Sequence, residues 1–398
     1  MSRTVLLTLT CLLAFVFPAV AHDEPATEKQ PQRKANPTQR RPPPVPRDVE
    51  GVEHFRIQSK LLTEFWGCPM YIDAGVILPL EHDKAKKITP ACYSIHGFGG
   101  SHSIAWRMGK RLRDMMAKGH PPMLYVFLNA QFSLGHHEFA DSVNNGPWGQ
   151  ALIEEFIPAF EEEFGAAPTA DGRFLTGHSS GGWSSMWLQV TYPEQFAGTW
   201  STAPDSIDFR DFTGINVYQH RNAYTDPEGN PVQLVRNGKG EWVRTIKEYA
   251  QGEAAKSDFG GQFASFDAVF SPRDIDGRPM KMFDRETGDI NDKVRDHWRK
   301  YDIVLKIRDN WSELKDKLSG KLHVYVGTYD TFRLEGAVLL AQAELKKLGS
   351  DAEFVIVEKR THGSLMAPHE TLWPKGLLPA IHQKMWAQWE ARTDESSP

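Results

Sequence analysis

The chain has 398 residues, of which 40% are hydrophobic and 24% charged, and its formal net charge is −5. This composition is typical of a globular protein, and the length suits one large α/β domain or two smaller ones. The main body has no long basic block, which makes nucleic acid a poor candidate partner. With only 3 cysteines, the chain is neither a disulfide scaffold nor a Cys-based zinc protein.

The first 21 residues have the pattern of a secretory signal peptide. Arg3 gives a positive start, residues 5–17 are apolar but too few for a comfortable membrane span, and Ala19 and Ala21 form a small-x-small cleavage pattern. We expect cleavage after Ala21, a secreted or periplasmic protein and no membrane span in the mature chain. An uncleaved membrane anchor is the alternative. Whether Cys68 and Cys92 pair in an oxidising compartment stays open.

Residues 22–51 are rich in Pro, Gln, Lys and Arg and have almost no large apolar side chain. Such a segment buries too little surface to fold, so we expect a disordered linker. Regular patterns begin near Val52, and we expect one domain over residues 52–398. Between residues 204 and 300 the order fades, which predicts an insertion of short helices and loops.

The folded part alternates strand and helix patterns. Strands are predicted at 54–59, 70–80, 91–95, 123–130, 173–177, 196–203, 321–330 and 352–357, and helices at 104–119, 151–165 (with a kink or break at Pro158), after Gly181, and at 312–320, 336–349 and 376–391. Alternation of this kind predicts a mostly parallel central sheet with helices on both faces.

A serine motif lies between a predicted strand and a predicted helix. Gly177-His178-Ser179-Ser180-Gly181 fits G-x-S-x-G, in which the central serine sits on a strained strand-to-helix turn and its neighbours must be small. The pattern selects Ser179 as the nucleophile. Ser180 has a different role, because the backbone N–H after the nucleophile donates to an oxyanion.

A second oxyanion donor is expected from the glycine-rich turn after the strand at 91–95. The turn reads His96-Gly97-Phe98-Gly99-Gly100, and the backbone N–H of Phe98 is the first candidate, with that of Gly99 the second. A plain glycine-rich connection between a strand and a helix is the alternative.

A serine nucleophile needs a base, and the base needs an acid that orients it. His362 follows the strand at 352–357 and is our candidate base, since the order along the chain should be serine, acid, histidine. His323 lies within a strand and is expected to be packed, while His369 and His382 lie in or near the last helix, where a solvated face is expected. Asp330, at the end of the strand at 321–330, is the candidate acid, and Asp205 and Asp208 are its rivals.

Together these motifs resemble a known family. The stretches 95–100, 144–149, 175–182, 327–332 and 361–364 are similar to the esterase-D-like branch of the α/β-hydrolases, over roughly Val52 to Ala391 with the 204–300 insertion as a departure. The resemblance implies an α/β-hydrolase fold, a triad of Ser179, Asp330 and His362, and oxyanion donors at Phe98 and Ser180. Inserts in such folds usually build the wall of the substrate pocket.

Other candidates are weaker. Trp148 and His178 are predicted to contact the substrate, although core packing is equally compatible with Trp148. His136, His137 and Glu138 are adjacent, and no further ligand is spaced to complete a metal site with them. A solvated loop is therefore favoured, and no metal site is predicted.

The sequence therefore predicts a secreted or periplasmic serine esterase that cleaves a carbohydrate-linked or siderophore-like ester without a cofactor. The alternatives are a non-catalytic binding module on a hydrolase fold, and an acyltransferase or peptidase with the same triad.

Overall fold

The structure is a computed structural model that describes residues 48–86, 88–257 and 259–395. The predicted signal peptide and nearly all of the predicted linker lie outside the described residues. Within those residues, no helix is both long enough and apolar enough to cross a bilayer.

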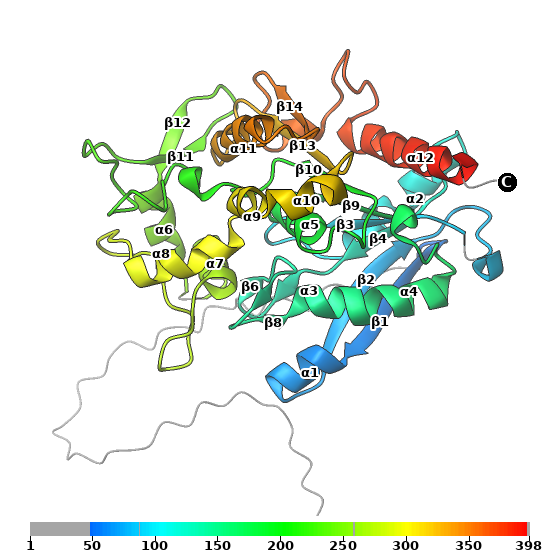
Figure 1. Cartoon of the computed structure of the whole chain (residues 1–398), viewed down its shortest axis with the longest axis horizontal. Helices are drawn as coiled ribbons and strands as arrows, with labels where there is room; N and C mark the ends of the chain where they lie inside the picture. Colours follow the sequence, from blue (N-terminus) through cyan, green and yellow to red (C-terminus); the bar gives the residue numbers. More distant parts are fainter. Residues whose placement is uncertain (1–47, 87, 258, 396–398) are drawn as a thin grey trace, which may run out of the picture. The chain divides into compact units, whose positions relative to one another are not determined.

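An eight-stranded sheet forms the centre of the fold, in the order β1-β2-β4-β3-β9-β10-β13-β14 (Figure 1). From β4 to β14 all neighbours are parallel, whereas β1 and β2 form an antiparallel pair and β2 runs antiparallel to β4. Its strands are β1 (Val52–Ser59), β2 (Met70–Ile77), β3 (Ala91–Ile95), β4 (Leu124–Leu128), β9 (Arg173–His178), β10 (Gly198–Thr202), β13 (Leu322–Gly327) and β14 (Glu353–Val357).

Neighbouring residues of the central strands belong to different hydrophobic clusters. In β4, Tyr125 and Phe127 pack with helices α2 and α12, whereas Val126 and Leu128 pack with α3 and α4. Successive side chains of a strand point to opposite faces, so both faces of the sheet are buried, as continuous apolar runs predict. The mostly parallel sheet between helical layers is confirmed.

The helices are α1 (Lys60–Trp66), α2 (Ile104–Met116), α3 (Trp148–Ala151), α4 (Ile157–Phe164), α5 (Ser180–Thr191), α6 (Ile246–Ala254), α7 (Gln262–Phe270), α8 (Asp292–Trp298), α9 (Ile303–Asp309), α10 (Trp311–Leu318), α11 (Glu335–Lys347) and α12 (Leu377–Glu395). The short turns of helix are η1 (Lys84–Lys86), η2 (Leu152–Phe156), η3 (Ala170–Gly172), η4 (Phe209–Asp211), η5 (Arg299–Tyr301) and η6 (Ser364–Met366).

The helix predicted at 151–165 is interrupted near Pro158, as expected. It runs as α3, a π-helical turn η2 and then α4, with the proline in the first turn of α4. Proline has no N–H to donate to the preceding turn, and a π-helical turn is one way to accommodate that loss.

The segment 204–300 contains η4, α6, α7, α8 and a hairpin of β11 (Gln233–Arg236) and β12 (Trp242–Thr245) that the sequence pattern did not reveal. Figure 1 shows α6, α7 and α8 grouped away from α12. Further short pairs, β5 (Gln131–Phe132) with β6 (Gly135–His136) and β7 (Asp141–Ser142) with β8 (Gly146–Pro147), follow β4.

Cys92 is a buried free thiol, so it forms no disulfide with Cys68 in this structure. Burial raises the pKa of the Cys92 thiol.

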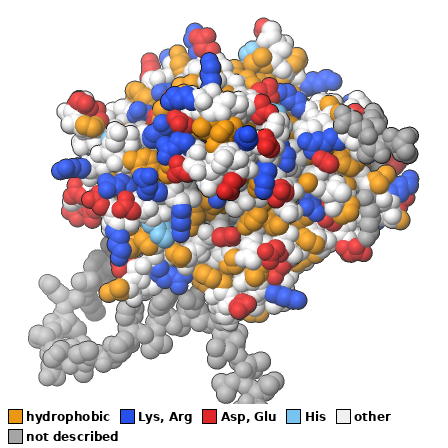
Figure 2. Space-filling model, viewed as in Figure 1, with side chains coloured by type: hydrophobic (Ala, Val, Ile, Leu, Met, Phe, Trp, Pro, Cys, Tyr) orange, Lys and Arg blue, Asp and Glu red, His pale blue; other side chains and the backbone are white. Residues whose placement is uncertain are grey.

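On the surface, basic and acidic side chains are interspersed over the face shown in Figure 2.

Candidate active site

Ser179 stands at a sharp turn between β9 and α5. Its φ is 61° and its ψ is −125°, a conformation that L-residues other than glycine rarely adopt. The backbone N–H of Ser179 donates to the carbonyl of Thr202 on β10 at 3.0 Å. The strained turn predicted from the motif is therefore present, with Ser179 at its apex.

The glycines around Ser179 allow neighbouring backbones to approach closely. A Cβ on Gly177 would lie 2.0 Å from the carbonyl oxygen of Gly181, and one on Gly181 would lie 2.0 Å from that of Ile95. A Cβ on Gly182 would meet Pro204 Cα at 2.9 Å. These positions explain why the motif has small residues on both sides of the serine.

The predicted oxyanion turn lies against the serine. The carbonyl of Gly97 accepts from the N–H of Gly100 at 3.0 Å, and Gly99 has a φ of 75°, so Phe98 and Gly99 are the central residues of a tight turn. A Cβ on Gly97 would be 3.1 Å from Ser179 Cβ. In the described part of the chain, the N–H groups of Phe98 and Ser180 have no protein acceptor, which leaves both able to donate to a ligand.

His362 and Asp330 form a buried pair. His362 Nδ1 donates to Asp330 Oδ2 at 2.8 Å, and Asp330 is completely buried. The other oxygen, Oδ1, accepts from the N–H groups of Phe332 at 2.9 Å and Leu334 at 3.4 Å. Burial alone would lower the pKa of His362, but the hydrogen bond and the charge of Asp330, together with the charge of Asp205, raise it above its ordinary value.

The hydroxyl of Ser179 points to Asp205. Ser179 Oγ donates to Asp205 Oδ1 at 3.3 Å, and Ser180 Oγ donates to Asp205 Oδ2 at 2.6 Å. Among the described residues no hydrogen bond joins Ser179 to His362. The rival acid thus contacts the nucleophile, while the predicted acid contacts the predicted base. Asp208, the third candidate, is buried in a pair with Arg210.

A buried polar layer lies under the serine turn, where we expected a solvated loop. His136, His137 and Glu138 are at most 1% exposed. Glu138 Oε2 accepts from Ser184 Oγ at 2.7 Å, and Glu138 Oε1 lies 3.2 Å from His136 Nδ1. Burial raises the pKa of Glu138, and burial together with Glu138 raises the pKa of Asp205 to about 6.

An apolar cavity of about 310 Å³ opens beside the oxyanion turn. Its lining includes Phe98 and the side chain of His178, whose ring centroid is 4.3 Å from that of His362. Burial and the neighbouring His362 lower the pKa of His178 to about 3, so this ring is neutral. The cavity wall is completed by residues of the sheet, of α2, of η6 and of α12, among them Met108, Phe127, Met366 and Leu378.

Trp148 does not line this cavity. It is 3% exposed, its ring stacks on His137 at 3.8 Å, and its Nε1–H donates to the carbonyl of Asn145 at 2.8 Å. The predicted contact with substrate is therefore corrected to core packing, the alternative that the sequence left open.

The insertion lines a second cavity near the serine. A small cavity of about 20 Å³ touches Asp205, and most of its lining comes from the insertion. Phe332, which also lines it, meets the ring of His362 edge-on at 5.1 Å. Besides Asp205, the lining residues from the insertion are Thr213, Leu234, Tyr249, Gln262, Phe263 and Phe266.

The other candidate histidines lie away from Ser179. His323 stacks on Trp200 at 4.5 Å, as expected for a packed strand residue. His382 is 2% exposed and hydrogen-bonds His120 at 3.0 Å, so the solvated helix face expected for it is wrong: α12 covers the sheet at this point.

Within the described residues, one cluster has side chains that could hold a metal ion: His54, Asp73 and His102, with ligand atoms within 4.8 Å of one another. Arg56 Nε donates to Asp73 Oδ1 at 2.6 Å, and His54 Nε2 lies 2.8 Å from the same oxygen. The Asp73 carboxylate is therefore already compensated by an arginine.

A strained serine between β9 and α5, free N–H groups beside it, and a buried His–Asp pair at the same sheet edge define the α/β-hydrolase class of serine hydrolases. Comparison with protein families agrees: residues 67–359 match the family described as "Putative esterase", and the chain belongs to that family. It is a serine hydrolase that acts on carboxylic ester bonds.

Solved structures share the fold at low sequence identity. A ferulic acid esterase is 13% identical, with a TM-score of 0.52 over 85% of this chain and 97% of its own. FphF, a fluorophosphonate-binding serine hydrolase from Staphylococcus aureus, is 14% identical, with a TM-score of 0.50 over 85% of this chain and 98% of its own. The comparison with curated proteins gave no match.

Proposed function

We propose that this chain hydrolyses its ester through an acyl-enzyme formed on Ser179. His362 Nε2 takes the proton of Ser179 Oγ as the oxygen attacks the ester carbonyl, and returns it to the leaving alcohol. The N–H groups of Phe98 and Ser180 donate to the oxyanion, and Asp330 stabilises the imidazolium. Water, deprotonated by His362, then releases the acid and restores Ser179.

The observation that carries this assignment is the bond from His362 Nδ1 to the buried Asp330 at 2.8 Å. With Nδ1 holding the proton shared with Asp330, Nε2 is the atom left to accept a proton. The Ser179 hydroxyl must turn from Asp205 to His362 before attack. Hydrogen bonds of catalytic groups are often formed only once substrate is bound, so the resting geometry is compatible with the mechanism.

Ser179→Ala tests the nucleophile. We expect turnover of p-nitrophenyl acetate to fall by about 10⁵–10⁶-fold, because no other group can carry the acyl intermediate. Ser185→Ala is the matched control: Ser185 lies on α5, the helix that directly follows Ser179, and donates to the carbonyl of Gly182 at 2.9 Å. Retained turnover in pure, folded Ser179→Ala protein would refute the assignment.

A fluorophosphonate probe separates the esterase from a binding module on the same fold. We expect the wild-type protein to be labelled at Ser179 and the alanine variant to stay unlabelled. A folded wild-type protein that never reacts would favour the binding module.

For the substrate, we propose a carbohydrate-linked or siderophore-like ester met outside the cytoplasm. Support comes from the signal-peptide pattern of residues 1–21 and from the cavity of about 310 Å³ beside the oxyanion turn, which has room for part of such a substrate. Amino-terminal sequencing of protein from an expressing cell should give His22 as the first residue. A panel of acylated sugars and siderophore esters, compared by kcat/KM, tests the substrate class, and a clear preference for thioesters would contradict it.

A further inference from the structure

Asp330 lies in a short segment between β13 and α11 that wraps around its own carboxylate. The N–H groups of Phe332 and Leu334 both donate to Asp330 Oδ1, and Oδ2 is left for His362. The direction of the carboxylate therefore depends on the conformation of residues 328–335. Arg333, inside this segment, has a φ of 60°, so its backbone is strained.

One arginine of the insertion contacts this segment at three points. The backbone N–H of Arg236 donates to the carbonyl of Thr331 at 2.9 Å, and its Nη1 donates to the carbonyl of Thr328 at 2.9 Å. The same Nη1 lies 2.6 Å from Glu335 Oε1. These contacts lie before, next to and after Asp330, so Arg236 ties both ends of the segment together.

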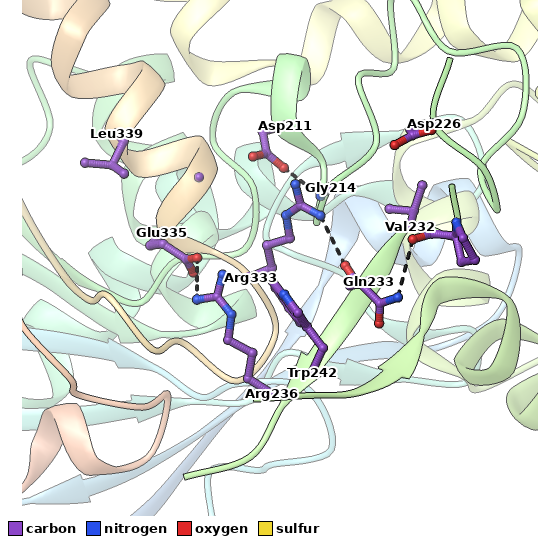
Figure 3. Close-up of a pocket in the computed structure, with 12 residues that line it drawn as sticks. Asp211, Gly214, Asp226, Val232, Gln233, Arg236, Trp242, Arg333, Glu335 and Leu339 are labelled. Atoms are coloured by element: carbon purple, nitrogen blue, oxygen red, sulfur yellow. Dashed lines mark hydrogen bonds and ion pairs between the residues drawn. The ribbon is translucent and has the colours of Figure 1, made fainter. Parts of the chain in front are cut away.

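The hairpin β11–β12 holds this arginine in place. Trp242 is the cross-strand partner of Arg236, and the guanidinium lies over its indole ring at 4.0 Å. Figure 3 shows Arg236 directed to Glu335 and Arg333 directed to the strand of Gln233. These residues line a cavity of about 430 Å³. Arg333 Nη1 donates to the carbonyl of Gln233 at 3.3 Å, which adds a return contact from the segment to β11.

Burial makes the central contact costly to break. The side chains of Arg236 and Glu335 are only 15% and 11% exposed. Removing one partner of a buried ion pair leaves an uncompensated charge, which is costly. The planar guanidinium stacks on Trp242 while its Nη1 contacts the carbonyl of Thr328 and the carboxylate of Glu335, and a lysine ammonium cannot reproduce that planar stacking.

We propose that Arg236 is a positioning residue: it holds residues 328–335 in the conformation that aims Asp330 at His362. The catalytic meaning of this role rests on the proposed function, whereas the effect on the His362–Asp330 pair does not. The insertion then has two tasks, because it lines the site near Asp205 and also fixes the acid of the triad.

The test is the titration of His362, followed by NMR of its imidazole in Arg236→Gln, Arg236→Lys and the control Arg244→Gln. Arg244 is an exposed residue of the same hairpin. We expect Arg236→Gln to lower the pKa of His362, because Asp330 no longer stabilises the imidazolium. Loss of a nearby positive charge would by itself raise this pKa, so a decrease identifies displacement of Asp330.

Arg236→Lys keeps the charge and loses the planar stacking on Trp242, so we expect a smaller decrease of the same sign, and Arg244→Gln should titrate like wild type. We expect kcat/KM of Arg236→Gln to fall by about tenfold to a hundredfold, as for a small misplacement of a reacting group. If Arg236→Gln does not fold, Arg236→Lys alone decides. A His362 pKa that is unchanged or raised in the folded Arg236 variants would overturn the proposal.

Failure of the proposed function would look different. In that case the wild-type protein would show neither ester turnover nor labelling by fluorophosphonate, while the NMR titration would still report whether Arg236 controls the His362–Asp330 pair.

Discussion

Asp330 and Asp205 are both buried and follow neighbouring parallel strands, β13 and β10, but their surroundings differ. Asp330 accepts from two backbone N–H groups and from His362. Asp205 accepts from the hydroxyls of Ser179 and Ser180 and lies near the buried Glu138. One carboxylate is surrounded by fixed dipoles and a base, the other by neutral hydroxyls and a second acid.

This difference separates two tasks that the sequence could not separate. A carboxylate held by backbone donors keeps its direction, which suits an acid that orients a base. A carboxylate beside another acid in a buried layer has a raised pKa, near 6 for Asp205, and so changes its charge close to neutral pH. We infer that Asp330 supplies a constant orientation and that Asp205 modulates the field around the nucleophile.

Replacing each aspartate by asparagine gives the largest expected contrast. Asp330→Asn should lower kcat by about 10³–10⁴-fold, since an amide can stabilise the wrong tautomer of His362 and cannot stabilise an imidazolium. Asp205→Asn should lower kcat by no more than about tenfold near neutral pH, because its oxygen still accepts from one serine. The measurement is the steady-state hydrolysis of p-nitrophenyl acetate.

The two variants are matched in size and burial, so each controls for the other, and circular dichroism checks that both fold. A larger loss in Asp205→Asn than in Asp330→Asn would exchange the two roles and make Asp205 the acid of the triad.

The dependence of stability on pH should report the titration of Asp205. The folded-state pKa of Asp205 is raised to about 6 from an ordinary value near 3.9. The folded state therefore binds the proton more tightly, and its stability falls as the pH rises from about 4 to about 6 and stays lower above that. Two pKa units correspond to about 3 kcal/mol.

Asp205→Asn cannot ionise and escapes this loss. Its free energy of unfolding minus that of the wild type should be about 3 kcal/mol larger at about pH 8 than at about pH 4, which means that the variant gains relative stability as the pH rises. Urea denaturation at the two pH values measures this difference, and the comparison cancels any effect of the substitution that does not depend on pH. An equal difference at both values would mean that Asp205 does not titrate in this range.

Much of the fold could be predicted from the sequence because its patterns are local. The continuous apolar run of β4 indicates burial on both faces, and the glycines of the serine turn report close backbone contacts that any side chain would block. The hairpin β11–β12 was not predicted because its strands are short and β12 is largely exposed. Its sequence therefore shows little alternation of apolar and polar residues.

The site was predicted less completely, because the features that the sequence did not reveal depend on contacts between residues that are distant in sequence. Nothing near His136 and Glu138 signals that α5 and α7 cover them, so these polar residues resembled a solvated loop. Trp148 resembled a pocket residue because it follows β4, whereas its stacking partner His137 is visible only in the fold. The contact between Asp205 and Ser179 spans 26 residues, and the only available signal was that Asp205 follows a strand end.

The pH dependence of the rate gives the smallest and most specific comparison. Turnover requires neutral His362, so kcat/KM should rise with pH through the pKa of this residue. Burial lowers that pKa while Asp330 and, to a lesser degree, Asp205 raise it, with a net increase, so the midpoint should lie above about 6.5. Asp205→Asn removes one negative charge and should move the midpoint down by a fraction of a unit. In a profile measured from about pH 5 to about pH 9, the ratio of variant to wild-type kcat/KM should therefore be greatest between about pH 6, above which Asp205 is mostly ionised in the wild type, and the midpoint of His362. A midpoint that stays in place would show that the charge of Asp205 does not reach His362, and would leave Asp330 as the one carboxylate that sets the basicity of the imidazole.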